Sequence, residues 1–158
     1  MNDTDTTVID EVNNHGWLPA TAAILALVGV ADSVYLTAHH YTAEPVPCSI
    51  IEGCEQVLTS GYAEIAGIPL AAFGAAAYFV AFSLALLTAY GYSNLWKFFG
   101  AQATIMAIFS GWLVYVQGAV IGAFCQFCLL SAITSFSLFA VYLFSWFRGR
   151  RSTNKPTA

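Results

Sequence analysis

Four long apolar runs, separated by polar connections of unequal length, set the pattern of the chain. They cover roughly residues 17–38, 67–90, 98–120 and 125–147. Each run approaches or exceeds the ~20 residues with which an α-helix crosses the hydrocarbon core of a bilayer. The pattern therefore predicts four helices that span a membrane.

The connections predict how these helices pack. Residues 91–94 form a tight turn between the second and third runs, and the glycine-rich link 118–122 joins the third run to the fourth. Links this short force neighbouring helices to lie antiparallel. We therefore expect an all-α fold, an integral membrane four-helix bundle.

The connection between the first two runs, residues 39–66, is far longer. It contains Pro45, Pro47 and Gly53, where we expect turns, with one short helix near 55–59. It also carries more apolar residues than a solvated loop needs: Ile50, Ile51, Val57, Leu58 and Ile65. We expect this loop to fold down as a cap over the mouth of the bundle.

Composition agrees with a membrane protein of one domain. The chain is 58% hydrophobic and 9% charged, whereas soluble domains carry about 25% charged residues. We expect a polar tail at 1–16, the membrane domain at 17–147 and a basic tail at 148–158. The first tail is acidic and lacks the basic start and apolar core of a cleavable signal. No run of like charge suggests nucleic acid.

The basic residues predict the orientation. If each run crosses the membrane once, all of them fall on the side of the N-terminus: Lys97, Arg148, Arg150, Arg151 and Lys155. Basic loops stay in the cytoplasm, so both termini are expected there, in a multi-pass protein of the cell membrane. Trp17, Trp96 and Trp146 would lie in the cytoplasmic aromatic belt.

Because each run crosses the membrane once, the same reasoning places all four cysteines on the extracytoplasmic face, where disulfides persist. Cys125 and Cys128 form a Cys-x-x-Cys at the start of the fourth run. A helix N-terminus lowers the pKa of a thiol there and activates it. A reversible disulfide is one interpretation of this pair, and the others are a structural disulfide or two buried thiols.

Cys48 and Cys54 close a small ring in the long loop. A structural disulfide across so few residues restricts the unfolded chain little, so a short-lived relay disulfide explains the pair better. A zinc site built from the four cysteines is the competing interpretation. Because the spacing is unusual for zinc, we expect no metal.

The spacing continues beyond the cysteines. Cys48-x5-Cys54-x5-Ser60 is followed by the Cys-x-x-Cys that opens the fourth run. Taken together, this pattern resembles the vitamin K epoxide reductase family. The likeness covers roughly residues 17–147 and is specific, because the related disulfide-forming quinone reductases place their Cys-x-x-Cys in the first extracytoplasmic loop. The flanking residues that agree are 32–37, 67–69 and 73–74.

The resemblance implies a membrane thiol–disulfide oxidoreductase that supports disulfide bond formation. Cys48 and Cys54 would take electrons from a thioredoxin-like partner, and Cys54 would attack Cys125. Cys128 would pass the electrons to a quinone of the menaquinone, ubiquinone or vitamin K type. Ser60 matches a loop hydroxyl of the family that lies near the active cysteines; otherwise it is a turn serine.

Three departures from the family's pattern refine this expectation. Vertebrate members carry a tyrosine where this chain has Ala132 and an asparagine where it has Leu70. Without these polar groups, quinone reduction is favoured over reduction of a quinone epoxide, which is the runner-up. The chain ends at Ala158, so we expect a bacterial- or archaeal-type member without a fused thioredoxin-like domain, whose partner acts in trans. A non-catalytic membrane protein with structural disulfides is the further alternative.

Asp32 is the only acid within a predicted span, and an intramembrane ionisable residue indicates function by default. It lies toward the extracytoplasmic half, where quinone reduction would consume protons. The alternative is a neutral carboxyl group hydrogen-bonded to a neighbouring helix. We also expect aromatic residues near Cys128 to line the quinone pocket: Phe73, Tyr115, Phe124 and Phe127.

Overall fold

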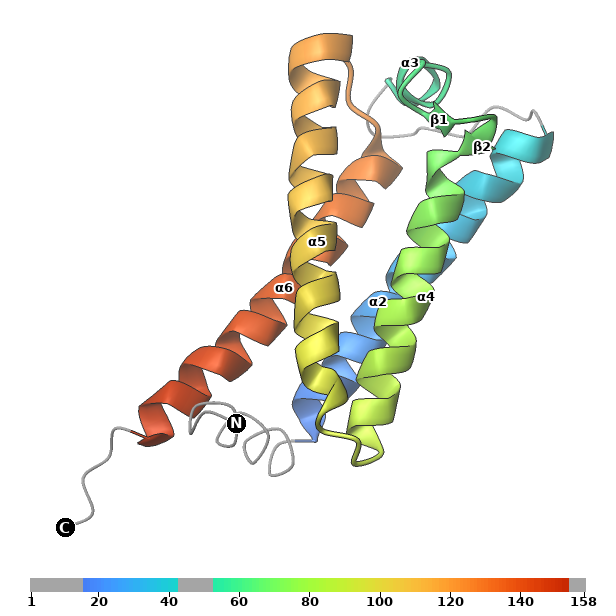
Figure 1. Ribbon diagram of the computed structural model, residues 1–158. Helices are drawn as coiled ribbons and strands as arrows, with labels where there is room; N and C mark the ends of the chain where they lie inside the picture. Colours follow the sequence, from blue (N-terminus) through green and yellow to red (C-terminus); the bar gives the residue numbers. More distant parts are fainter. Residues whose placement is uncertain (1–15, 43–52, 154–158) are drawn as a thin grey trace.

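Four long helices form a bundle in Figure 1, a computed structural model that describes residues 16–42 and 53–153, with side chains to residue 148. All four helices are long and apolar enough to cross a membrane. The predicted all-α, four-helix membrane fold is therefore confirmed. The helices are α2 (Trp17–Thr42), α4 (Leu70–Ala89), α5 (Leu95–Tyr115) and α6 (Gln126–Thr153).

A small hairpin that the sequence did not predict precedes α4. Strand β1 (Glu64–Ile65) pairs antiparallel with β2 (Ile68–Pro69). The two residues between the strands, Ala66 and Gly67, have positive φ angles of 54° and 79°, and such a mirror-image turn matches the twist of the strands. Helix α4 consequently begins at Leu70, three residues later than the apolar run.

The non-helical link between α5 and α6 is shorter than the glycine-rich stretch 118–122 led us to predict. A π-helical turn, η1 (Val116–Ile121), continues α5 through most of the 118–122 stretch. The break comes at Gly122, whose φ of 71° lies in the left-handed region that glycine reaches without steric cost. The chain then reverses over residues 122–125, which places Cys125 immediately before the first residue of α6.

The half of the bundle farther from the hairpin is solidly packed. Trp96 is 1% exposed; its ring stacks on Phe99 at a centroid distance of 4.6 Å. Its indole Nε1–H donates a hydrogen bond to Oγ of Ser145 at 3.1 Å. The prediction that Trp96 lies in an aromatic belt is therefore wrong, because small neighbours such as Ala85 and Ala103 leave room for the indole in the core.

The opposite end of the bundle carries a cap. Helix α3 (Cys54–Leu58) and the hairpin lie over this end in Figure 1. The expected short helix near 55–59 is thus confirmed, shifted by one residue. Cys54 and Val57 are buried against residues of the α5–α6 link, including Ala123. The described part of the loop, from residue 53 onward, therefore folds down onto the bundle as predicted, while Ile50 and Ile51 lie outside the described residues.

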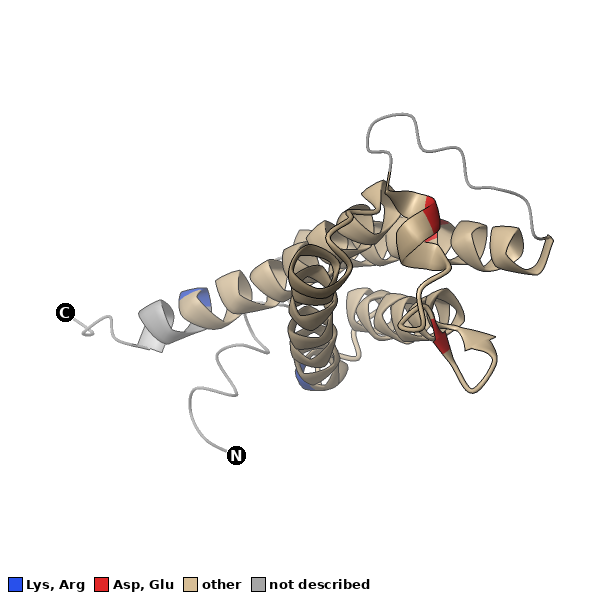
Figure 2. Ribbon diagram, turned by 90° about the horizontal axis from the view of Figure 1, so that it is seen from above, with Lys and Arg blue, Asp and Glu red and all other residues tan. Residues whose placement is uncertain are grey.

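The few charged residues are segregated by sign along the bundle. Figure 2 shows acidic residues on α3 and β1, at the cap, and basic residues near the start of α5 and in the last part of α6. These residues are Glu55, Glu64, Lys97 and Arg148. The cap end of the described chain is acidic and the end remote from it is basic.

Candidate functional site

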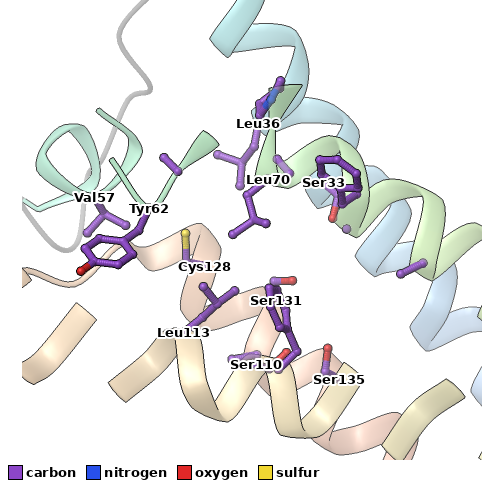
Figure 3. A pocket seen from close by; sticks show the side chains of 18 of the residues that line it. Ser33, Leu36, Val57, Tyr62, Leu70, Ser110, Leu113, Cys128, Ser131 and Ser135 are labelled. Carbon is purple, nitrogen blue, oxygen red and sulfur yellow. The ribbon is translucent and has the colours of Figure 1, made fainter. Parts of the chain in front are cut away.

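A cavity of about 390 Å³ lies between the four helices and beneath the cap. Its wall is mainly apolar, with contributions from α2, α4, α5, η1, α6 and the cap. Figure 3 shows the sulfur of Cys128 projecting from α6 into this space, with Val57 and Tyr62 of the cap on one side and Leu70 of α4 on another. One member of the Cys-x-x-Cys is therefore open to the cavity.

The other member of the motif, Cys125, is buried next to it. Cys125 has no exposed surface and belongs to a buried cluster with Cys54 and Ala123. Cys128 packs against the edge of that cluster. Cys54 is disulfide-bonded, whereas Cys125 and Cys128 are free thiols. Cys48, predicted to pair with Cys54, lies outside the described residues.

The close approach of the cap depends on Gly53. A Cβ atom at this position would lie 2.6 Å from the carbonyl oxygen of Phe124 and 3.0 Å from its nitrogen. Real side chains essentially never approach backbone this closely, so any other residue would push the cap outward. Glycine therefore lets the start of α3 sit directly on the residue before Cys125.

Gln117 holds the Cys125 backbone in place. Its Oε1 accepts a hydrogen bond from the N–H of Cys125 at 3.0 Å, and its own carbonyl oxygen accepts one from the N–H of Ala123 at 3.2 Å. The side chain is 3% exposed and lies in the π-helical turn η1. Sequence reasoning missed this residue, although a glutamine in an apolar run eight residues before Cys125 was a visible signal.

The surroundings of Cys125 favour its thiolate. Hydrogen bonding to the Cys128 thiol is the largest influence and lowers the Cys125 pKa from 9.0 to about 7. Backbone N–H groups of Phe127 and Cys128 act in the same direction, while burial of the thiol opposes them. A thiolate is the species that attacks or leaves in disulfide exchange, so Cys125 is the more reactive of the two free thiols.

Asp32 lies in the cavity wall. It is 7% exposed, and neither carboxylate oxygen has a hydrogen-bond partner among the described residues. The alternative in which this carboxyl is hydrogen-bonded to a neighbouring helix is therefore not what the described part of the chain shows. Ser60 also lines the cavity, and its hydroxyl donates to the carbonyl oxygen of Val57 at 2.7 Å.

The four aromatic residues predicted for the pocket are divided by the structure. Phe73 lines the cavity. Tyr115 and Phe124 are exposed on the outer surface of the bundle, and the Phe127 ring packs on Tyr35 at a centroid distance of 5.3 Å. None of these three lines the cavity: helical phase turns Tyr115 and Phe127 away from it, and Phe124 lies in the non-helical link before α6.

Three further polar groups, which sequence reasoning did not select, lie together at the cavity wall. The Tyr78 hydroxyl donates to the carbonyl oxygen of Ser131 at 2.6 Å. It also lies 2.9 Å and 2.8 Å from the hydroxyls of Ser131 and Ser135. This network joins α4 to α6 between the hollow and the solid parts of the bundle.

Fold and site together define a small membrane protein whose Cys-x-x-Cys connects a capped disulfide with an apolar cavity. The chain belongs to the vitamin K epoxide reductase family, whose model matches residues 20–143. Among curated proteins, it is 36% identical over 120 residues to the thiol-disulfide oxidoreductase LTO1 of Arabidopsis thaliana. That match covers 68% of this chain and 31% of the relative, so the chain spans about a third of the relative's length. The resemblance seen in the cysteine spacing is confirmed.

Proposed function

We propose that the protein is a membrane thiol–disulfide oxidoreductase that carries electrons from Cys48 and Cys54 through Cys125 and Cys128 to a quinone. The observation that supports this most is the division of the Cys-x-x-Cys: Cys125 is buried beside Cys54, and Cys128 faces the cavity. Family membership and the naming of the plant relative as a thiol-disulfide oxidoreductase point the same way.

The electron transfer follows ordinary disulfide exchange. A reduced thioredoxin-like partner first converts the Cys48–Cys54 disulfide to two thiols. With Cys125 and Cys128 oxidised, the Cys54 thiolate attacks the sulfur of Cys125, and Cys128 leaves as a thiolate. Cys48 then attacks Cys54 and regenerates the first disulfide. Cys125 leaves in this step, which its lowered pKa of about 7 favours.

The cavity suits a quinone head group. Binding sites for small molecules are commonly pockets of about 300–1,000 Å³ with mostly apolar walls and few polar groups, and the cavity of about 390 Å³ fits that description. A bound quinone, of the menaquinone, ubiquinone or vitamin K type, supplies an acceptor for two electrons and two protons. Cys125 and Cys128 release the same number when they form their disulfide, so the exchange balances.

Two wall residues favour a quinone over a quinone epoxide as substrate. Leu70 and Ala132 both line the cavity, at the positions where the sequence comparison expected the polar groups of vertebrate members. This chain offers neither an asparagine amide nor a tyrosine hydroxyl there to a strained epoxide oxygen. Quinone reduction is therefore the proposed reaction.

The charge distribution supports an orientation with the cap outside the cytoplasm. Lys97 and Arg148 lie at the end of the bundle remote from the cap, and basic residues remain cytoplasmic. The cap and all four cysteines would then face the oxidising compartment, where a thioredoxin-like partner in trans could reach Cys48.

The test is quinone reduction by purified protein, followed by absorbance, with either a reduced thioredoxin-like protein or a small dithiol as electron donor. Cys125→Ala and Cys128→Ala should abolish turnover with both donors. Cys48→Ala and Cys54→Ala should abolish it only with the protein donor. If the wild-type protein reduces no quinone with either donor, the proposal is wrong, and structural disulfides become the better explanation.

A further inference from the structure

A buried acid lies where the proposed reaction needs protons. Asp32 lines the same cavity as Cys128 and is more than nine-tenths buried. Neither of its oxygens meets a donor among the described residues. Burial of an unpaired carboxylate in an apolar membrane interior is strongly unfavourable, so the side chain rests as the neutral acid.

The neutral acid has a hydrogen to donate, whereas two other hydroxyls of the cavity wall already donate theirs to backbone. The Tyr78 hydroxyl already donates to the carbonyl oxygen of Ser131, and the Ser60 hydroxyl already donates to that of Val57. Each of these donors is satisfied by backbone. The Asp32 hydroxyl has no acceptor within the described chain, so its natural acceptor is a carbonyl oxygen of a molecule in the cavity.

We propose that Asp32 is the acid through which protons reach the quinone bound in this cavity. This inference rests on the function proposed above. Formation of the Cys125–Cys128 disulfide releases two protons and two electrons, and conversion of a quinone to a hydroquinone takes up two of each. Asp32 gives its proton to a quinone oxygen and recovers one from the dithiol, so it is unchanged after each cycle.

The charge of Asp32 also reaches the active cysteine. An ionised Asp32 raises the pKa of the Cys125 thiol, because two negative charges in one apolar region repel. A carboxylate at Asp32 therefore disfavours a thiolate at Cys125. Protonation of the Asp32 carboxyl is thereby coupled to protonation of the Cys125 thiol, as transfer of a proton between them requires.

Other titratable groups border this region and have to be separated from Asp32 in any pH experiment. On α5 the cavity wall contains none among the described residues. His40 is held 3.3 Å from Glu64 at the cap. The remaining titratable groups are Tyr78 on α4, Tyr62 on the cap, Cys125 and Cys128 at the start of α6, and His39 and His40 on α2.

The experiment compares Asp32→Asn with wild type in the two half-reactions. Reduction of the Cys125–Cys128 disulfide by a small dithiol should be nearly unchanged. Oxidation of the dithiol by menadione should slow by on the order of 10²-fold, which is typical for loss of a general acid. In wild type, the rate of dithiol oxidation should fall as pH rises and Asp32 ionises. In the Asn variant, the rate should be low and should show no fall caused by ionisation at position 32. Asp32→Glu should recover part of the rate.

A measurement without quinone accompanies the kinetics. Infrared spectra of the quinone-free protein should show the C=O band of a protonated carboxylic acid that is absent from Asp32→Asn. Thr134→Val is the matched control, because it removes a buried hydroxyl of α6 that is outside the cavity wall. This control should alter neither half-reaction nor the band.

The outcomes separate this inference from the proposed function. If wild type oxidises its dithiol with menadione and Asp32→Asn does so within about twofold of the same rate, Asp32 is not the acid, although the enzyme assignment stands. An ionised carboxylate at Asp32 in the infrared spectrum at neutral pH would also overturn the inference. If wild type itself fails to react with quinone, the proposed function is wrong.

Discussion

The two halves of the bundle use the same four helices, but one is filled and the other is hollow. Remote from the cap, the stacked Trp96 and Phe99 fill the centre, and alanines let the helices approach closely. Beneath the cap, a space of about 390 Å³ remains, and polar or reactive groups such as Asp32 and Cys128 line it. Tyr78 lies at the junction and belongs to both regions.

The difference shows how stability and chemistry are divided. In a membrane, helix association relies on close packing and interhelical hydrogen bonds, and the filled half supplies both. The hollow half is less closely packed. A few specific contacts position its residues, among them the Gln117–Cys125 hydrogen bond and the close approach of Gly53 to Phe124. Changes in the filled half should therefore reduce stability, and changes in the hollow half should mainly alter the reaction.

The largest effect on stability is expected for Gly100→Ala in the filled half. An added Cβ would collide with the ring of Tyr142, and overpacking costs about 1–3 kcal/mol, occasionally more. Alanine's better helix propensity returns only about 1 kcal/mol. Thermal unfolding in detergent should show a lower midpoint, while the folded fraction keeps its quinone reduction rate.

Gly111→Ala is the matched control on the same helix. Its Cβ would meet only the Phe136 ring, at an ordinary 3.7 Å, so the midpoint should stay level or rise. Equal destabilisation by both substitutions would contradict the contrast between a tight contact and an open one.

The next effect is a pH shift in the hollow half. Because the Cys128 thiol is the main cause of the lowered Cys125 pKa, Cys128→Ala should move that pKa upward from about 7 toward 9.0. The thiolate at Cys125 would then form only at higher pH. Ultraviolet absorbance of the thiolate, titrated in quinone-free protein, measures the shift. A Cys125 titration that stays near 7 in the variant would show that the helix terminus alone sets it.

The third effect is expected for Gln117→Leu, again in the hollow half. The substitution leaves the buried N–H of Cys125 without its acceptor, at a cost of about 1–3 kcal/mol. The strain falls on the turn that carries Cys125. The rate of disulfide exchange with Cys54 should therefore be the property most affected, and the unfolding midpoint should be affected less. Rapid-quench trapping of the mixed disulfide measures the exchange rate.

Gln102→Leu provides the control for this glutamine. Gln102 also lies in the cavity wall, but its Nε2 donates a long hydrogen bond, of 3.5 Å, to the carbonyl oxygen of Ala77. It should leave the exchange rate near that of wild type. The role given to Gln117 fails if both variants slow exchange equally.

The sequence predicted the helices and the capping helix because lipid imposes a strong pattern. An apolar run of sufficient length has few alternatives to a helix in a membrane, and burial stabilises an apolar cap residue such as Val57. The redox pairs were also visible, because Cys-x-x-Cys at a helix start and a second pair nearby are local features of the chain.

What could not be predicted depended on helical phase and on contacts between distant segments. Tyr115 and Phe124 are close to Cys128 in sequence, but their helix and link turn them outward. Trp96 looked like a residue of the membrane surface until Ser145, 49 residues away, supplied a partner for its indole. That Asp32 has no hydrogen-bond partner within residues 16–42 and 53–148 could likewise be recognised only once its neighbours were in place.

The central claim is that the dithiol facing the cavity gives its electrons to a quinone. The most direct test is a single turnover without oxygen, in which protein with the Cys54 disulfide intact and with Cys125 and Cys128 as free thiols reacts with one equivalent of menadione. Quinone absorbance and the Cys125–Cys128 disulfide, identified by mass spectrometry, are followed together. The account predicts that one quinone is consumed for each Cys125–Cys128 disulfide formed, and that Cys128→Ala shows neither. Disulfide formation without loss of quinone, or no reaction in the wild-type protein, would contradict it.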